Sequence, residues 1–363
     1  MTDAAATADD AVPPDDEARE LLETLVSTPS PTPEEDDCAA ALAAFLESHG
    51  REVFRDEVGN VRAPADDSVL YTSHVDTVPG DVPVRVEDGD DGPVLWGRGA
   101  VDAKGSLAAL AVAAVRTGVS FVGVVGEETD SRGARHLVAD REPPEAVVNG
   151  EPSGWDGLTL GYRGLVSGTY IATSELGHTS RPENNAIQDA VAWWSAVEER
   201  FGTDTGTDAG GEDGDAPVFE RVTTKPVAVE GGVGEEGLTV EATLEAQLRV
   251  PPSYSTAEVR ELADAELAAG TVRWTDAVEP TMQSARTPVA RALRAAIRER
   301  GGEPRLLRKT GTADMNVYAD AWDCPMATYG PGDSALDHAP DERLPLRALD
   351  RSVAVLEAVA ARL

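Results

Sequence analysis

The stretch that most constrains the fold is residues 71–80, which read Tyr-Thr-Ser-His-Val-Asp-Thr-Val-Pro-Gly. An apolar run over 68–71 leads into it, and the Pro-Gly pair then turns the chain. A buried strand that ends in this way delivers His74 and Asp76 to the carboxyl edge of a sheet, where open α/β folds place their chemistry. A histidine at a strand end is most often only hydrogen-bonded, but with an acid two residues later it also suits a metal ligand.

The surrounding pattern predicts an α/β domain around this strand. Val119–Val125 is a continuous apolar run, which suits a central parallel strand buried on both faces. Ala103–Arg116 is rich in small apolar residues and predicts a helix packed closely on the sheet. A further strand, Ala146–Val148, is followed by Glu151. Acidic residues therefore follow several of the predicted strands.

The pattern changes in the middle of the chain. From about 164 to 276 the order is strand, helix, strand, strand, helix, strand, with predicted helices over 186–200 and 256–268. This is the split, ferredoxin-like layout. The α/β pattern then resumes, and its closing helix is predicted over 344–362. We therefore predict a disordered N-terminus (1–13), a catalytic domain (14–164 and 277–363) and an inserted lid domain (165–276).

The charge is the most unusual feature of the composition. The chain has 66 acidic and 31 basic residues, a net charge of −35, and only three lysines. Such a surface suits concentrated salt, where a Debye length of about 3 Å at 1 M screens self-repulsion. We interpret the chain as a cytoplasmic protein of a halophile; the alternative is an acidic surface for a basic partner. Nucleic-acid binding is disfavoured because no basic patch could neutralise phosphates.

The spacing of the cysteines and the length of the apolar runs argue against several other classes of protein. Cys38 and Cys324 lie far apart without motif spacing, so neither a disulfide framework nor a thiolate zinc site is predicted. The sequence contains no apolar run of about 18 residues, the length of a membrane span. The N-terminus lacks the basic and apolar regions of a signal peptide.

Two imidazoles and several carboxylates are the candidate site residues, mostly at the ends of predicted strands: His74, Asp76, Asp102, Glu127, Glu128, Glu151 and His338. This nitrogen and oxygen set suits zinc, cobalt or manganese. Five ligands exceed one tetrahedral zinc, and one shared carboxylate would give two sites of three ligands each. The set predicts a two-metal hydrolytic centre, with ions roughly 3.5–4 Å apart. The alternative is that Glu127 and Glu128 are solvated acids and His338 a structural loop histidine.

Four motifs in order resemble the M20 family of co-catalytic metallopeptidases and deacylases. They are Ser73-His-Val-Asp-Thr-Val-Pro79, Gly97-Arg-Gly-Ala-Val-Asp-Ala-Lys-Gly105, Gly126-Glu-Glu-Thr-Asp-Ser-Arg-Gly133 and the late His338. The resemblance covers nearly the whole chain beyond residue 15. It implies an α/β fold with a zinc-peptidase-like mixed sheet flanked by helices, an inserted ferredoxin-like α+β lid, and two divalent ions, Zn²⁺ or Co²⁺.

The resemblance also implies a role for each candidate residue. One metal would be held by His74 and Glu151, the other by Glu128 and His338, with Asp102 as the bridging carboxylate, Asp76 behind His74, and Glu127 as the general base. It further implies a cis peptide bond between Asp102 and Ala103.

Lid residues are assigned by resemblance as well. His178, in Gly177-His-Thr-Ser180, is similar to a histidine that stabilises the oxyanion, commonly across a homodimer formed by the lid. Arg249 resembles the lid arginine that receives a substrate carboxylate, with an exposed surface arginine as the alternative. Asn184 and Asn185 are weaker candidates to face the substrate.

Within the family, three stretches resemble the amino-group-carrier-protein hydrolases. They are 149–164, 309–316 and 330–334. This implies release of lysine or ornithine from the γ-carboxyl group of the C-terminal glutamate of a small acidic carrier protein, in lysine or arginine biosynthesis. Lys309, Asp314 and Asn316 would line the amino-acid pocket, and a cluster of Arg305, Arg308 and Lys309 would receive the carrier.

Two other functions stay open. One is a free-substrate deacylase, such as acetylornithine deacetylase or succinyl-diaminopimelate desuccinylase. The other is a non-catalytic binding module, which is disfavoured because Glu127 and all five ligand candidates are present. The sequence does not choose lysine over ornithine, which differ by one methylene, worth about 1–3 kcal/mol in a pocket.

Overall fold

The structure, a computed structural model, describes residues 12–180, 182–202 and 217–363 in two compact units. Unit 1 holds the described residues up to Leu160, together with Gln283–Leu307 and Ala313–Leu363. Unit 2 holds Gly161–Met282 and Arg308–Thr312. The predicted lid, 165–276, falls within unit 2, and the segment 308–312 groups with it. The N-terminal segment predicted to be disordered lies almost wholly outside the described residues.

Unit 1 is built on a mixed sheet whose four central strands are parallel. These are β6 (Val119–Val124), β3 (Asp66–His74), β7 (Val147–Gly150) and β15 (Met326–Thr328), in that order. Its outer strands are β1 (Phe54–Arg55), β2 (Val61–Ala63), β8 (Gly157–Tyr162) and β14 (Arg305–Lys309), the last two ending in residues that group with unit 2. Strand β13 (Thr281–Met282), which pairs with the end of β8, belongs to unit 2. Because parallel strands end at the same edge, the residues that follow β3, β6, β7 and β15 are brought together.

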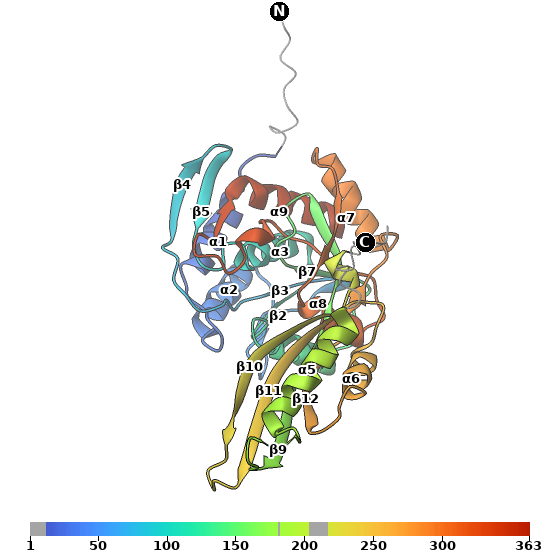
Figure 1. Cartoon of the computed structure of the whole chain (residues 1–363). Helices are drawn as coiled ribbons and strands as arrows, with labels where there is room; N and C mark the ends of the chain where they lie inside the picture. Colours follow the sequence, from blue (N-terminus) through green and yellow to red (C-terminus); the bar gives the residue numbers. More distant parts are fainter. Residues whose placement is uncertain (1–11, 181, 203–216) are drawn as a thin grey trace, which may run out of the picture. The chain divides into compact units, whose positions relative to one another are not determined.

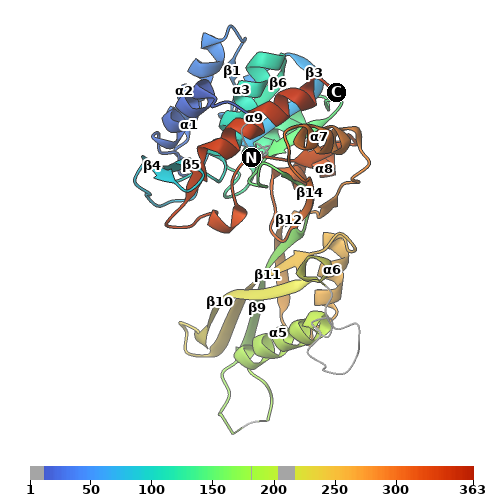
Figure 2. The ribbon, with the colours of Figure 1, turned by 90° about the horizontal axis from the view of Figure 1, so that it is seen from above.

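Helices cover both faces of this sheet (Figures 1 and 2). The hydroxyl of Tyr71 donates to Leu356 O on α9 (Leu346–Ala360), whereas Thr72 Oγ1 lies 3.1 Å from the hydroxyl of Tyr318 on α8 (Asp314–Ala321). Successive strand residues point to opposite faces, so α8 and α9 lie on opposite sides. Contacting α9 are α1 (Asp16–Val26), α3 (Lys104–Thr117) and α7 (Pro288–Glu299); α2 (Asp36–Ser48) contacts α1, and α4 (Arg132–Asp140) contacts α8.

A small antiparallel sheet joins two distant parts of unit 1. It consists of β4 (Arg85–Gly89), β5 (Gly92–Trp96) and β16 (Arg343–Pro345). Of the three, only β5 contains a short apolar stretch, Val94–Trp96, that predicts a strand from the sequence. The predicted helix start at Leu344 is wrong, because 343–345 pair with β5 and α9 begins at Leu346, directly after Pro345.

Unit 2 is a four-stranded antiparallel sheet with two helices on one face. The strand order is β10 (Thr223–Val233), β11 (Thr239–Val250), β9 (Gly164–Glu175) and β12 (Thr271–Val278). Trp193 Nε1, on α5 (Ala186–Gly202), donates to Ala263 O on α6 (Thr256–Asp264), and both helices pack on the same apolar core. This is the split layout. Helix α6 ends at Asp264, not 268 as predicted, since the chain must turn through Gly270 (φ 74°) into β12.

The predicted α/β class with a mixed sheet is therefore confirmed. Short 3₁₀ turns occur at Val218–Glu220 and Ser334–Leu336. Across the described part of the chain, every helix is too short or too polar to span a membrane.

Candidate metal centre

The parallel strands of unit 1 deliver the predicted site residues to one edge of the sheet. His74 is the last residue of β3, Glu127 and Glu128 follow β6, and Glu151 follows β7. Asp102 lies in the turn between β5 and α3, and the peptide bond that follows it is cis, as the resemblance implied. His338 comes from the loop after β15.

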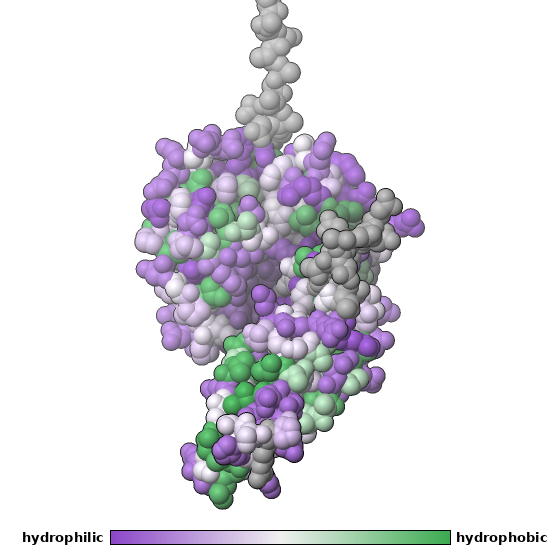
Figure 3. Space-filling model, viewed as in Figure 1, coloured by the Kyte–Doolittle hydropathy of each residue, from purple (hydrophilic) through white to green (hydrophobic). Residues whose placement is uncertain are grey.

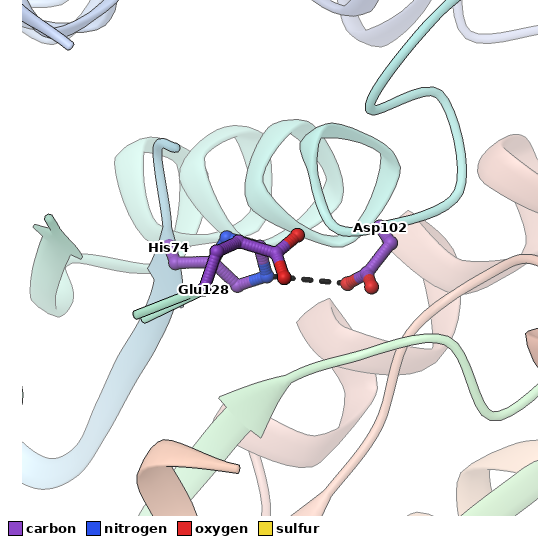
Figure 4. Close-up of side chains that lie close together, drawn as sticks. All are labelled: His74, Asp102 and Glu128. Carbon is purple, nitrogen blue, oxygen red and sulfur yellow. Dashed lines mark hydrogen bonds and ion pairs between the residues drawn. The ribbon is translucent and has the colours of Figure 1, made fainter. Parts of the chain in front are cut away.

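Asp102 lies between the two histidines. Its Oδ1 is 3.2 Å from His74 Nε2, and its Oδ2 is 3.2 Å from His338 Nε2. Each imidazole also has a second carboxylate: Glu151 Oε1 lies 3.9 Å from His74 Nε2, and Glu128 Oε2 lies 3.1 Å from His338 Nε2. Figure 4 shows His74, Asp102 and Glu128 pointing toward one another. One ligand atom from each of these three lies within 4.8 Å of the other two.

The ring of His74 has a fixed orientation. Its Nδ1–H donates to Asp76 O at 2.9 Å, because a carbonyl oxygen can only accept, and Asp76 Oδ1 lies 3.7 Å from the same nitrogen. With Nδ1 held in this way, Nε2 is the nitrogen that faces Asp102, where it donates to Oδ1 at 3.2 Å, and it is the nitrogen that a metal ion would take in exchange for the proton.

Asp76 also holds the turn that carries the two glutamates. Its Oδ1 accepts the backbone N–H of Glu127 (3.2 Å), and its Oδ2 accepts those of Glu128 (3.1 Å) and the Thr32 hydroxyl (2.6 Å). Burial opposes the charged form of Asp76, but these hydrogen bonds and His74 lower its pKa to about 2. One buried carboxylate thus connects β3 to the turn after β6.

The turn itself depends on Gly126, whose φ of 77° favours glycine. Beyond it the side chains of Glu127 and Glu128 separate. Glu128 reaches His338, whereas the Glu127 carboxylate has no hydrogen-bond partner among the described residues. Adjacent glutamates can therefore serve different purposes here, one as a ligand and one toward a substrate.

The pKa values of the site residues are strongly shifted from their ordinary values. Burial opposes ionisation of Asp102, but His338 and His74 hold its pKa well below the ordinary range. The hydrogen bond to Asp102, aided by Glu128, raises the pKa of His338 to about 9. Burial raises the pKa of Glu128 to about 7, and burial with repulsion from Glu151 raises that of Glu127 well above normal.

This donor set fits divalent cations. The carboxylates repel one another in a buried site, and Glu128 Oε1 is buried without a hydrogen-bond partner among the residues that the structure describes. Nitrogen and carboxylate donors on both sides of Asp102 match the ligand preferences of zinc and cobalt. Such ions would replace the protons that the site otherwise retains.

Sequence reasoning missed three side chains beside the site. Thr32 binds Asp76, Lys104 Nζ donates to Leu25 O (2.9 Å) and Thr28 O (2.8 Å), and Glu342 is fully buried beside Asp102. Lys104, one of only three lysines, and the spacing of Glu342 from His338 were the only available signals.

Unit 2 places three predicted lid residues together. His178, Asn184 and Asn185 line one open hollow of about 910 Å³, in which Ser180 Oγ lies 2.8 Å from His178 Nδ1. Arg249 lies elsewhere in this unit, partly buried, with Nη1 3.4 Å from Thr312 Oγ1.

Two side chains of the basic cluster predicted to bind the carrier are already paired with acids of this chain. Arg305 forms an ion pair with Asp156 at 2.7 Å, and Arg308 one with Glu220 at 2.8 Å. Lys309 is partly exposed, and its carbonyl accepts from the backbone N–H of Arg163. Both ion pairs are half-exposed, so they are weak enough to exchange partners.

Known proteins resemble this chain over almost its full length. It is 41% identical to the LysW-lysine hydrolase of Deinococcus radiodurans, covering 95% of this chain and 97% of the relative. It is 36% identical to a Thermococcus kodakarensis protein provisionally named a LysW-lysine/LysW-ornithine hydrolase, covering 94% and 92%.

Solved structures show the same fold. The M20 family metallo-carboxypeptidase Sso-CP2 from Sulfolobus solfataricus superposes with a TM-score of 0.75 at 18% identity, covering 96% of this chain and 99% of that one. Aminopeptidase PepT from Bacillus cereus gives 0.71 at 20% identity, covering 95% and 98%. The sequence profile of peptidase family M20/M25/M40 matches residues 70–362. The profile match, the relatives and the geometry of the site together show that the chain belongs to peptidase family M20/M25/M40.

Proposed function

We propose that the protein is a two-metal amide hydrolase that releases lysine or ornithine from the C-terminal glutamate of a small acidic amino-group carrier protein. The observation that carries the proposal is the position of Asp102, with one carboxylate oxygen toward each of two imidazoles. The carrier substrate is supported by the names of relatives 41% and 36% identical over nearly the whole chain. The activity belongs to lysine or arginine biosynthesis.

Two divalent ions, zinc or cobalt, would be held by five side chains. His74 and Glu151 face one side of Asp102, and Glu128 and His338 face the other. When bound, such ions polarise the scissile carbonyl and lower the pKa of the attacking water.

The chain's own groups then move the protons. Glu127, whose carboxylate is not engaged by a hydrogen bond among the described residues, takes a proton from the water that attacks the carbonyl carbon. It returns this proton to the nitrogen as the C–N bond breaks, so the amino acid leaves as a neutral amine. Asp76 keeps His74 and the Glu127–Glu128 turn in position.

Lid residues supply the remaining contacts. His178 is assigned to the oxyanion of the tetrahedral intermediate, and Asn185 shares its hollow. Lys309 lines the pocket of the amino acid.

Arg249 receives a carboxylate of the substrate. Burial lowers its pKa, and among the described residues no carboxylate forms an ion pair with it, in a chain where acids outnumber bases 66 to 31. Arg221 is similar, with a buried Nε that has no hydrogen-bond partner in the described ranges of the chain. Arg163 fixes this region by donating to Thr310 O (3.0 Å) and Thr223 Oγ1 (2.9 Å). A partly buried guanidinium without an acidic partner suits an incoming anion.

A homodimer through unit 2 completes the proposal. β10 is an edge strand, and its side chains Val227, Val229 and Val233 are more than half exposed. Figure 3 shows apolar residues gathered on the surface of this unit. An unpaired apolar edge of this kind is a template for pairing with a second copy. The cytoplasmic, halophilic setting rests on the composition alone.

The decisive comparison is between carrier-linked and free substrates. Release of lysine and ornithine from their carrier conjugates is measured beside hydrolysis of N-acetylornithine and N-succinyl-diaminopimelate. The proposal predicts metal-dependent release from a conjugate, with the free substrates turned over far more slowly. Equal turnover of the free substrates would identify a free-substrate deacylase instead, and no hydrolysis of any of them would indicate a binding module.

A further inference from the structure

Glu342 is a fully buried carboxylate that takes no part in the chemistry proposed above. It is 0% exposed and lies four residues after His338, at the end of the loop that carries this histidine. A carboxylate is stable in such a position only if its oxygens are fully satisfied.

Within the described part of the chain, all of the hydrogen-bond donors to Glu342 come from the turn that carries Asp102. Oε1 accepts the backbone N–H groups of Val101 (2.8 Å) and Asp102 (3.0 Å). Oε2 accepts the N–H of Gly99 (3.1 Å) and Nη1 of Arg98 (2.8 Å). The carbonyl of Glu342 also accepts the N–H of Gly97 at 3.2 Å, completing five bonds to one turn.

These bonds connect the two loops that meet at the metal centre. The turn 97–103 carries Asp102, and the loop before β16 carries His338. Next to Glu342, Arg343 is paired with Trp96 in the small antiparallel sheet, so backbone pairing and the buried carboxylate act at the same place. On the far side of Asp102, Lys104 Nζ is held by Leu25 O and Thr28 O. The backbone of Asp102 is thereby fixed on both sides.

We propose that Glu342 is a positioning residue for the metal centre. It holds Asp102 at the distance from His338 at which the two oxygens of Asp102 face two separate imidazoles. Charge-assisted bonds to a buried carboxylate are among the stronger hydrogen bonds, and a bridging ligand tolerates little displacement. Metal affinity therefore depends on Glu342, although it contacts no metal. This inference rests on the proposed metal centre and not on the identity of the substrate.

The test is a Co²⁺ titration of the metal-free Glu342→Gln protein, followed by visible absorption and calorimetry. Glutamine keeps the size of the side chain but turns an amide NH₂ toward backbone N–H donors. The matched control is Asp350→Asn. Asp350 is also buried, 2% exposed, and accepts from Asp15 N and the Arg19 guanidinium, neither of them part of the centre.

We expect Glu342→Gln to weaken Co²⁺ binding by about 10–100-fold and to alter the cobalt spectrum. Asp350→Asn should bind Co²⁺ as the unaltered protein does, while the Tm of the two metal-free variants falls to a similar extent. Unchanged affinity and spectrum in Glu342→Gln, or equal loss of affinity in both variants, would overturn the proposal. Absence of Co²⁺ binding by the unaltered protein would instead refute the metal centre itself.

If the Glu342→Gln protein does not fold, the Arg98→Met variant tests the same proposal. This change removes the guanidinium bond to Oε2, together with a long bond of 3.4 Å from Nε to Gly80 O, and leaves the two bonds to Oε1 in place. A several-fold weaker Co²⁺ affinity supports the positioning role, and unaltered affinity contradicts it.

Discussion

His338 Nε2 lies 3.2 Å from Oδ2 of Asp102, although Asp102 belongs to the first sequence segment of unit 1 and His338 to the last. The other oxygen of the same carboxylate faces His74 at the same distance. A structural aspartate needs only one such partner. Here each oxygen of Asp102 faces a different imidazole, and each imidazole has a further glutamate beside it. This is the arrangement expected of a carboxylate shared by two cations.

Glu127→Gln should separate catalysis from metal binding. The amide cannot accept the proton of the attacking water, so kcat on the carrier conjugate should fall by about 10²–10⁴-fold. Metal content and KM should stay unchanged, because Glu127 is not one of the proposed ligands. Steady-state kinetics with metal analysis checks this, with the exposed Glu57→Gln as the control. A kcat within twofold of the unaltered enzyme would remove Glu127 from the mechanism.

Metal-free protein should lose stability as the pH rises from about 6 to 9. The folded-state pKa of Glu128 is raised to about 7 and that of His338 to about 9, so the folded protein binds these protons more tightly than the unfolded chain. Their contribution to the free energy of unfolding is fully present at low pH. The part due to Glu128 is lost as the pH rises through about 7, and the part due to His338 is lost as the pH rises through about 9.

Saturating Zn²⁺ or Co²⁺ should abolish this slope, since the ion replaces the protons and binds more tightly at higher pH. Tm measured against pH in molar salt, with and without metal, tests the prediction. The metal-free Glu128→Gln variant should show a shallower slope. A Tm that is constant or rising from pH 6 to 9 without metal would be incompatible with the charge pattern of the site.

Arg249→Met should impair substrate binding. Methionine keeps much of the apolar length but loses the charge-assisted contact, worth about 1.5–3 kcal/mol. KM for the conjugate should rise by roughly 10–100-fold, with a smaller effect on kcat. Arg260→Met is the control, because Arg260 lies on α6 of the same unit and donates to Thr275 O. Equal effects of the two substitutions would argue against a carboxylate site at Arg249.

Val229→Lys should disrupt the dimer. Val229 is 61% exposed on the edge strand β10, and a lysine there is a device that prevents edge-to-edge pairing. Light scattering after size exclusion should give a dimer for the unaltered protein and a monomer for the variant. The control is Val86→Lys, on β4 of unit 1, where the valine is 47% exposed. A dimer that persists in Val229→Lys would place the interface elsewhere.

Much of the site could be predicted because it follows buried parallel strands. The apolar runs that end at His74 and before Glu127 are visible in the sequence, and strand ends at one sheet edge converge without further information. The order of elements in unit 2 could be predicted from the succession of strand and helix patterns in the sequence. Strand β4 could not be found, since Arg85–Gly89 is entirely exposed and shows no apolar alternation.

The supporting residues could not be predicted for a different reason. Glu342 is one acid among 66, and apart from its spacing from His338 nothing in the sequence around it distinguishes a buried carboxylate from the solvated ones. Its importance comes from backbone N–H groups of a turn distant in sequence, which no local pattern encodes. Thr32 is hidden in the same way, because it meets Asp76 only in the folded chain.

The most direct test of the shared carboxylate is anomalous diffraction from crystals of the cobalt-loaded protein. The account predicts two cobalt peaks, one beside each carboxylate oxygen of Asp102, with His74 at one and His338 at the other. A single peak, or two peaks to which Asp102 contributes no oxygen, would contradict it.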